Sequence, residues 1–190
     1  MGTRGAYGFH LNGKDKGTYN HFDSYPSGLG ADVVRFIQET DDAELERIAN
    51  KIVLVDEGGR PTGRQVVQCS DAGTVNLGVS EQSLEDWYCL LRNAQGDLNV
   101  YKGDLPYMID SASFLSDSLF CEWAYIINLD TEELEVYEGF NKRPDAPGRY
   151  ANTETDNGYF GVKLIDVVNL EDVRNRDADG LVDQWEAEED

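Results

Sequence analysis

The sequence has 190 residues, and its 40% of apolar residues is enough to build one hydrophobic core. Its 37 Asp and Glu residues outnumber its 16 Lys and Arg residues, and the formal net charge of −21 disfavours nucleic-acid backbones and anionic membranes as partners, because both repel such a surface. No apolar run approaches the roughly 20 residues that span a bilayer, and no apolar signal segment follows Met1, so we expect a cytoplasmic protein.

The N-terminal part of the sequence predicts a β-hairpin. Apolar residues alternate with small or polar ones over residues 7–11, turn-forming residues occupy 12–15, and a second strand is indicated over residues 18–23. Alternation along this second strand places His21 and Asp23 on one face. We therefore expect the imidazole of His21 and the carboxylate of Asp23 to be neighbours.

This pair is the centre of a candidate catalytic site. Asp23 would orient the His21 ring and raise its basicity, so that His21 acts as a general base. Arg4 would hold an anionic group of the substrate, and the Tyr25 hydroxyl would donate a hydrogen bond. The alternative is structural: His21 and Asp23 form a hydrogen bond at a strand end, and Tyr25 with Pro26 makes a turn.

The same residues carry a resemblance. Residues 1–4 read Met-Gly-Thr-Arg, and residues 19–26 read Tyr-Asn-His-Phe-Asp-Ser-Tyr-Pro. The chain thereby resembles an uncharacterised family of small microbial and viral proteins that open with Met-small-Thr-Arg and carry a Tyr-x-His-x-Asp-x-Tyr-Pro segment. The resemblance covers about the first 30 residues. It draws attention to the four candidate residues, but it implies no reaction, because the family brings no established activity.

Helices are predicted next. A short helix is indicated by the apolar residues Val33, Val34, Phe36 and Ile37. A second begins at Asp41, which forms a capping-box pattern with Glu44 and is followed by apolar residues at helical spacing, Leu45, Ile48, Ala49 and Ile52. Residues 65–69 indicate a strand. A further helix behind Ser80 or Ser83 is predicted by the stripe Leu84, Trp87, Tyr88 and Leu91.

The second half of the sequence predicts another hairpin and a long loop. Residues 123–129 and 134–137 form the hairpin, and residues 159–168 form a further strand. Between them, the Pro- and Gly-rich segment 139–158 is too long for an ordinary connection, so it is either functional or mobile. It contains the cations Lys142, Arg143 and Arg149, which would grip an anionic ligand. The alternative is a solvated loop whose charges offset their neighbours.

The acidic C-terminal segment contains a pattern similar to EF-hand calcium loops. Positions 1, 3, 5, 9 and 12 of such a loop are filled by Asn175, Asp177, Asp179, Asp183 and Glu186. Gly180 stands at position 6, where the loop needs a sharp turn. This is the one cofactor that the sequence suggests, although Asn175 replaces the usual leading Asp. The alternative is a solvated or frayed tail without calcium.

The three cysteines, Cys69, Cys89 and Cys121, lack the CxxC spacing typical of zinc sites. Cys89 and Cys121 lie among Trp, Leu and Phe residues, so we expect buried thiols rather than disulfides or metal ligands. A cysteine nucleophile would need His10 or His21 as its base, because the sequence holds only these two histidines.

These elements predict an α+β fold. We expect an antiparallel sheet made from two hairpins and a C-terminal strand, with two or three helices on one face. Residues 1–170 would form a single domain, and residues 171–190 an acidic C-terminal tail. Two functions stay open: a small-molecule-binding or hydrolase-like site around His21 and Asp23 that needs no cofactor, or a non-enzymatic inhibitor or decoy that binds a basic partner surface. The oligomeric state is left open.

Overall fold

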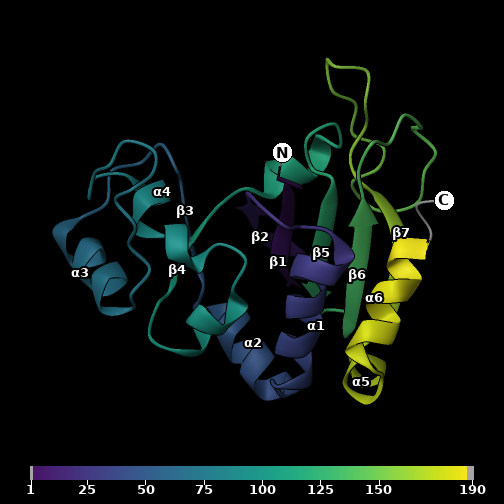
Figure 1. Cartoon of the computed structure of the whole chain (residues 1–190), viewed down its shortest axis with the longest axis horizontal. Helices are drawn as coiled ribbons and strands as arrows, with labels where there is room; N and C mark the ends of the chain where they lie inside the picture. Colours follow the sequence, from purple (N-terminus) through teal and green to yellow (C-terminus); the bar gives the residue numbers. More distant parts are fainter. Residues whose placement is uncertain (1, 188–190) are drawn as a thin grey trace.

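The protein has an α+β fold, as predicted, in a computed structural model that describes residues 2–187 (Figure 1). Its main sheet has five strands, which lie side by side in the order β2 (Lys14–Asn20), β1 (Gly5–Leu11), β5 (Trp123–Asn128), β6 (Glu133–Glu138) and β7 (Lys163–Asn169). Both predicted hairpins and the predicted C-terminal strand are therefore present. The strands alternate inward and outward side chains, so each face of the sheet carries its own apolar layer.

One junction in the sheet differs from the prediction. β1 and β2, β5 and β6, and β6 and β7 are antiparallel, but β1 pairs with β5 in parallel, from Gly5 opposite Trp123 to His10 opposite Asn128. Strands joined by a tight turn must be antiparallel, whereas β1 and β5 are joined through the whole middle of the chain, which leaves their direction free. The sheet is consequently mixed.

The turn of the first hairpin lies within the predicted segment 12–15 but is shorter, because β2 already begins at Lys14. Asn12 and Gly13 both have positive φ angles, 54° and 72°, as a two-residue type I′ turn requires. Their backbone N–H groups donate to the carboxylate of Asp130 at 2.7 and 2.8 Å. The second strand is displaced from its predicted position, because β2 covers Lys14–Asn20 rather than residues 18–23 and so ends before His21.

Helices cover one face of the sheet (Figure 1). They are α1 (Ala31–Gln38), α2 (Asp42–Lys51), α5 (Leu170–Asn175) and α6 (Ala178–Glu186). The predicted cap of α2 is confirmed, since the Asp41 carboxylate accepts a hydrogen bond from the backbone N–H of Glu44 at 2.8 Å. The core between these helices and the sheet includes Phe9, Tyr125 and Trp185. Within residues 2–187, no helix is long and apolar enough to cross a membrane.

A second group of elements lies beside the sheet (Figure 1). It contains β3 (Val53–Val55) paired in parallel with β4 (Tyr107–Ile109), together with α3 (Gly63–Asp71), α4 (Trp87–Leu90) and the short 3₁₀ turns η2 (Arg92–Ala94) and η3 (Leu98–Lys102). The strand predicted over residues 65–69 is wrong, because this segment lies in α3. The helix predicted from Leu84 is reduced to the single turn α4.

The other face of the sheet is covered by a 3₁₀ turn, η4 (Ala112–Ser116), and by the long loop 139–162. Tyr150 of this loop packs against Tyr137 of β6, with ring centroids 5.0 Å apart. Val162 and Leu115 are fully buried in the same apolar cluster. The loop that the sequence marks as functional or mobile therefore covers a sheet face.

The predicted acidic tail is instead part of the folded domain. Trp185 is fully buried, and its indole N–H donates to the carboxylate of Asp166 at 2.7 Å. Leu181 and Val182 are buried in the same core as α1, while the acidic residues of the segment point to solvent. The tail prediction took the high charge as a sign of disorder and missed this apolar stripe at helical spacing. Residues 188–190 of that tail lie outside the described residues.

Candidate functional site

The predicted His21–Asp23 pair is not formed. β2 ends at Asn20, and Asp23 has a φ of 54°, so the alternation that would have placed both side chains on one face stops before it reaches them. His21 Nδ1 instead shares a 2.6 Å hydrogen bond with the hydroxyl of Tyr19. Asp23 lines a separate cleft, and His21 is not among the residues that line it.

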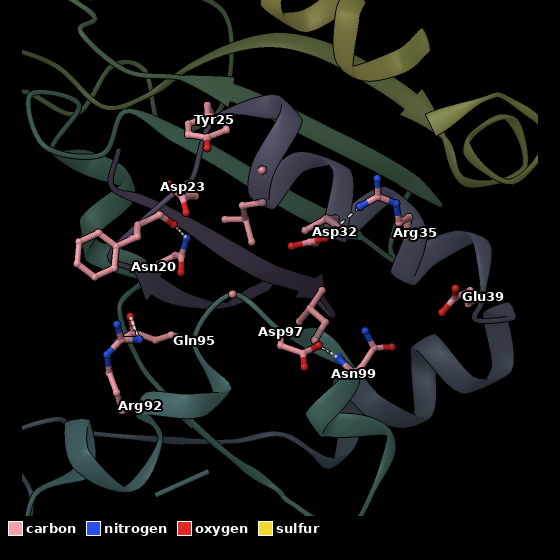
Figure 2. Close-up of a pocket in the computed structure, with 16 residues that line it drawn as sticks. Asn20, Asp23, Tyr25, Asp32, Arg35, Glu39, Arg92, Gln95, Asp97 and Asn99 are labelled. Atoms are coloured by element: carbon pink, nitrogen blue, oxygen red, sulfur yellow. Dashed lines mark hydrogen bonds and ion pairs between the residues drawn. The ribbon is translucent and has the colours of Figure 1, made fainter. Parts of the chain in front are cut away.

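This cleft is the candidate site (Figure 2). Its volume is about 710 Å³, which lies in the usual range for small-molecule sites. One wall is the segment 20–39, which runs from the end of β2 through the short turn η1 (Pro26–Gly30) into α1. The other wall is residues 92–99, between η2 and η3. The polar and charged residues that line it are Asn20, Asp23, Tyr25, Asp32, Arg35, Glu39, Arg92, Gln95, Asp97 and Asn99.

Close packing of the backbone shapes the first wall. The backbone N–H of Leu29 donates to the carbonyl of Asp23 at 2.8 Å, which closes the turn. A Cβ atom at position 28 would lie 2.2 Å from that same carbonyl oxygen, so only glycine fits there. The side-chain amide of Asn20 donates to Ser24 Oγ at 2.9 Å and holds the base of the turn. The turn presents Asp23 and Tyr25 to the cleft.

The second wall is anchored to the sheet by one buried tyrosine. The Tyr7 hydroxyl, on β1, donates to the carbonyl of Ala94 at 3.0 Å and accepts from the backbone N–H of Gly96 at 2.8 Å. Gly96 has a φ of 80°, a left-handed backbone conformation that turns the chain just before Asp97. The Asp97 carboxylate accepts from the backbone N–H of Asn99 at 2.9 Å and so begins η3.

The cleft is negatively charged. Its four carboxylates, on Asp23, Asp32, Glu39 and Asp97, exceed its two guanidinium groups, on Arg35 and Arg92, and leave a net formal charge of −2. Partial burial between the walls raises the pKa of the Asp32 carboxyl, and the negative charge of Asp97 acts in the same direction, although Arg35 opposes both. Asp32 accepts one hydrogen bond of 3.3 Å from Arg35 and keeps 63% of its side chain exposed.

The chemistry of the lining suits binding. The side-chain amides of Asn20, Gln95 and Asn99 supply both donors and acceptors, and the half-exposed ring of Tyr25 offers an apolar surface. The lining contains no His, Cys, Ser or Lys side chain. Among residues 2–187, no group of three His, Cys, Asp or Glu side chains is arranged to hold a metal ion.

The four predicted catalytic residues fall into two places. Asp23 and Tyr25 line the cleft, as described. Arg4 does not line it, because its guanidinium stands over the ring of Phe120 at 4.9 Å, and His21 lies outside it against the ring of Phe22. Burial lowers the pKa of His21, and the charges of Arg92 and Arg4 lower it further. The structure therefore divides the predicted site: Asp23 and Tyr25 line the cleft, and Arg4 and His21 lie outside it.

The predicted anion-binding cluster of the long loop is also not formed. Lys142 stands over the ring of Tyr159, and Arg143 forms an exposed ion pair with Asp145. Arg149 binds the carboxylate of Glu135 at 2.5 Å and that of Asp15 at 3.4 Å. Each cation is therefore held by its own neighbours. The sequence analysis gave an alternative in which the charges of the loop offset those of adjacent groups, and this alternative describes the loop.

The structure does not bring the predicted calcium ligands together. Residues 178–186 form the helix α6, whereas an EF-hand loop needs an extended turn that wraps around the ion. The Asp177 carboxylate caps this helix by accepting from the backbone N–H of Gly180 at 3.0 Å. Glu186 accepts from the backbone N–H of Ser27 at 3.0 Å and so ties α6 to η1. Asp179 and Asp183 are exposed on the helix surface, and Asn175 ends α5.

The cysteine thiols are buried, as predicted for Cys89 and Cys121. All three cysteines are free and buried. Burial raises the pKa of the Cys69 thiol to about 11 and raises that of Cys121 further. Since the reactive form of cysteine is the thiolate, these environments oppose a nucleophilic role.

Two features of the structure were missed by the sequence analysis. The carboxylates of Asp32 and Asp97 face one cleft although they come from distant segments, and no sequence motif connects them. A true His–Asp pair joins His10 Nδ1 to Asp15 Oδ1 at 2.6 Å. This second feature was predictable, because a type I′ turn at residues 12–13 sets His10 directly opposite Asp15 in the hairpin.

Comparisons of the chain with protein-family models, with curated proteins and with solved structures give no match. The resemblance of the first 30 residues to an uncharacterised family stays a prediction. Any functional argument therefore depends on the geometry and charge of the residues themselves.

Proposed function

We propose that this protein binds a small organic molecule that carries a positively charged amine, and that the amine lies between Asp32 and Asp97 in the cleft. The observation that carries the proposal is the placement of these two carboxylates on opposite walls of one cavity (Figure 2). Arg35 offsets only part of their combined charge. A bound cation would relieve the remaining repulsion.

Three further properties support an amine. The protein's net charge of −21 raises the local concentration of cations near its surface. The ring of Tyr25 gives a face on which an ammonium group or its hydrocarbon part can rest. The amides of Asn20, Gln95 and Asn99 would bind polar groups elsewhere on the ligand. The three free thiols fit a reducing compartment, which supports the predicted cytoplasmic location.

Titration calorimetry with 1,4-diaminobutane, and with 1,4-butanediol as its uncharged analogue, tests this function. We expect the diamine to bind and the diol to bind far more weakly. Asp32→Asn and Asp97→Asn should each weaken diamine binding by about tenfold, because a hydrogen bond to a charged group contributes about 1.5 kcal/mol or more. Asp183→Asn is the matched control, since it removes the same charge from an exposed position on α6 outside the cleft lining.

Equal losses in all three variants would show general attraction by the acidic surface and would overturn the cleft as the binding site. Binding of the diol as tight as that of the diamine would overturn the role of charge. Failure of the diamine to bind at millimolar concentration would also contradict the proposal.

The second candidate function is an acidic inhibitor or decoy that binds a basic protein surface. The observation in its favour is the net charge of −21, together with carboxylates that α6 directs to solvent, such as Asp179 and Asp183. Polylysine is a suitable probe. On this hypothesis, Asp183→Asn weakens polylysine binding at least as much as Asp32→Asn does, whereas an effect confined to Asp32→Asn would contradict it.

A further inference from the structure

A local group of cations stands out in this acidic protein. Among residues 2–187, six of the ten arginines form ion pairs with carboxylates. The arginines that form none are Arg4, Arg64, Arg92 and Arg176. Two of these four, Arg4 and Arg92, lie near His21. Arg4 precedes Gly5, which pairs with Asn20 in the hairpin, and Arg92 and His21 both contact the ring of Phe22. The charges of both arginines lower the pKa of His21, after burial has done so. The two arginines come from the N-terminus and from η2, segments that the fold brings to the same end of β2.

Each of these two guanidinium groups stands over an exposed aromatic ring. Arg4 lies over Phe120 at 4.9 Å, and Arg92 lies over Phe22 at 5.9 Å. The side chains of Phe120 and Phe22 are 41% and 50% exposed. The ring of His21 packs edge-on against Phe22, with centroids 4.2 Å apart. The group therefore combines cations with accessible apolar surface.

Most of the hydrogen-bonding capacity of this group is unused within the described part of the chain. Arg92 makes one long hydrogen bond, of 3.4 Å, to the side chain of Gln95, although a guanidinium carries five N–H donors. His21 uses Nδ1 in its hydrogen bond with Tyr19. Its other ring nitrogen, Nε2, has no hydrogen-bond partner among residues 2–187. An incoming acceptor would meet several donors at once.

The charged and titratable neighbours leave the site favourable to an anion. Glu57 and Tyr88 act on Tyr19 from the adjacent segments. Glu122 accepts the backbone N–H of Arg4 at 3.1 Å. At the imidazole itself, burial lowers the pKa of His21 and the charges of Arg92 and Arg4 lower it further. Two arginines without carboxylate partners in the described chain thus gather at one place in a protein of net charge −21.

We propose that Arg4, Arg92 and His21 bind the phosphate of a small phosphate monoester whose aromatic part packs against Phe22, the ring that both Arg92 and His21 contact. Two unpaired guanidinium charges match the charge of a phosphate dianion, and the planar N–H groups of arginine suit its oxygens. The exposed ring of Phe22 supplies the apolar contact that inorganic phosphate would lack. This site adjoins the cleft proposed for amine binding and shares Arg92 and Phe22 with it, whereas Arg4 and His21 lie outside the cleft lining.

Titration of the labelled protein with phenyl phosphate at pH 7.5, followed by calorimetry and by NMR of the His21 ring, tests the proposal. Inorganic phosphate and phenol serve as the two partial ligands. We expect phenyl phosphate to bind more tightly than either, and to shift the His21 signals and raise the pKa of His21. Arg4→Gln and Arg92→Gln should each weaken binding by about tenfold, as expected for loss of a charge-assisted pair.

Arg64→Gln is the matched control, because Arg64 is exposed on α3 and also lacks a carboxylate partner in the described chain. It should leave phenyl phosphate binding unchanged. Arg4→Lys keeps the charge and should retain part of the affinity, which separates loss of binding from loss of folding. Equal weakening by Arg64→Gln, or binding without a shift at His21, would overturn the proposal.

Arg4→Gln also separates this proposal from the function proposed for the cleft. Arg4 does not line the cleft, so this variant should bind 1,4-diaminobutane as the unmodified protein does. If the protein binds the diamine but not phenyl phosphate, the phosphate site is wrong and amine binding stands. If the protein binds phenyl phosphate through Arg4 but does not bind the diamine, the amine-binding function is wrong and the phosphate site stands.

Discussion

The side chain of Arg149 holds the long loop against the sheet. It binds the carboxylate of Glu135 at 2.5 Å, and Asn128 and Tyr137 donate to the same carboxylate at 2.8 Å each. Glu135 is only 7% exposed, so its negative charge depends on these partners. Burial raises the pKa of the Tyr137 hydroxyl, and the charge of Glu135 raises it further, which keeps that hydroxyl a donor.

Replacement of Arg149 by methionine should therefore destabilise the protein. We expect the free energy of unfolding in urea to fall by about 2 kcal/mol, less than the roughly 3–5 kcal/mol lost when a fully buried ion pair is broken, because 31% of the Arg149 side chain is exposed. Arg143→Met is the control, since its ion pair with Asp145 is exposed and should contribute little.

Adding Glu135→Gln to the Arg149→Met variant should restore part of the lost stability, because it removes the unpaired buried charge. If the two single arginine variants lose equal stability, the ion pair between Arg149 and Glu135 does not hold the loop.

The sequence analysis predicted a His–Asp pair at His21 and Asp23, whereas the structure forms such a pair between His10 and Asp15. Alternation is reliable only while the chain stays in a strand, and β2 ends at Asn20, so His21 and Asp23 lie beyond its range. The sequence analysis missed the pairing of His10 with Asp15, because it assigned residues 12–15 to the turn. A two-residue turn at Asn12 and Gly13 fixes this register across the hairpin, so turn chemistry would have been the better guide to side-chain neighbours.

At the level of elements, helix α6 closes the domain. It packs Trp185 against Tyr125 of β5, with ring centroids 6.2 Å apart, and Glu186 binds η1 through the backbone of Ser27. Because η1 is part of the first wall of the cleft, the last helix supports the candidate site without lining it. Charge on its outer surface and apolar residues on its inner surface make α6 amphipathic.

Trp185→Ala should consequently cost roughly 3–5 kcal/mol of unfolding free energy, the usual loss for a large buried aromatic residue. Asp183→Ala, on the exposed surface of the same helix, should leave the urea midpoint nearly unchanged. Circular dichroism during urea unfolding measures both. If the two variants have equal midpoints, α6 contributes no more than the acidic tail predicted from the sequence.

Local capping patterns decided how well the elements could be predicted. Asp41 and Glu44 signal the start of α2 and were recognised. Thr62 and Gln65 form an equally good capping box at the start of α3, but the β-branched pair that follows at residues 66–67 favoured a strand. The second wall of the cleft carries a weaker signal, because Asp97 caps only the short turn η3. Residues 92–99 are held by long-range contacts such as the buried hydroxyl of Tyr7, which no local pattern predicts.

On the scale of the whole molecule, the net charge of −21 acts against the compact state, because unfolding lets the carboxylates move apart. Added NaCl should raise the free energy of unfolding in urea. Most of the gain should be reached near 0.15 M, where the Debye length is about 8 Å. The m-value should stay constant, since salt does not change the surface exposed on unfolding. A decrease in stability on adding salt would show that attractive ion pairs outweigh the repulsion.

The parallel junction of β1 and β5 sets the order in which the chain can fold during synthesis. β1 leaves the ribosome first, but its partner follows 118 residues later, since Gly5 pairs with Trp123. At the usual rate of about 5–20 residues per second, the growing chain waits roughly 6–24 s for that partner. During this time the nascent hairpin carries an open edge on β1, which becomes an interior strand of the finished sheet. The turn of the hairpin can form early in synthesis, whereas the hairpin joins the rest of the sheet only after β5 has been made.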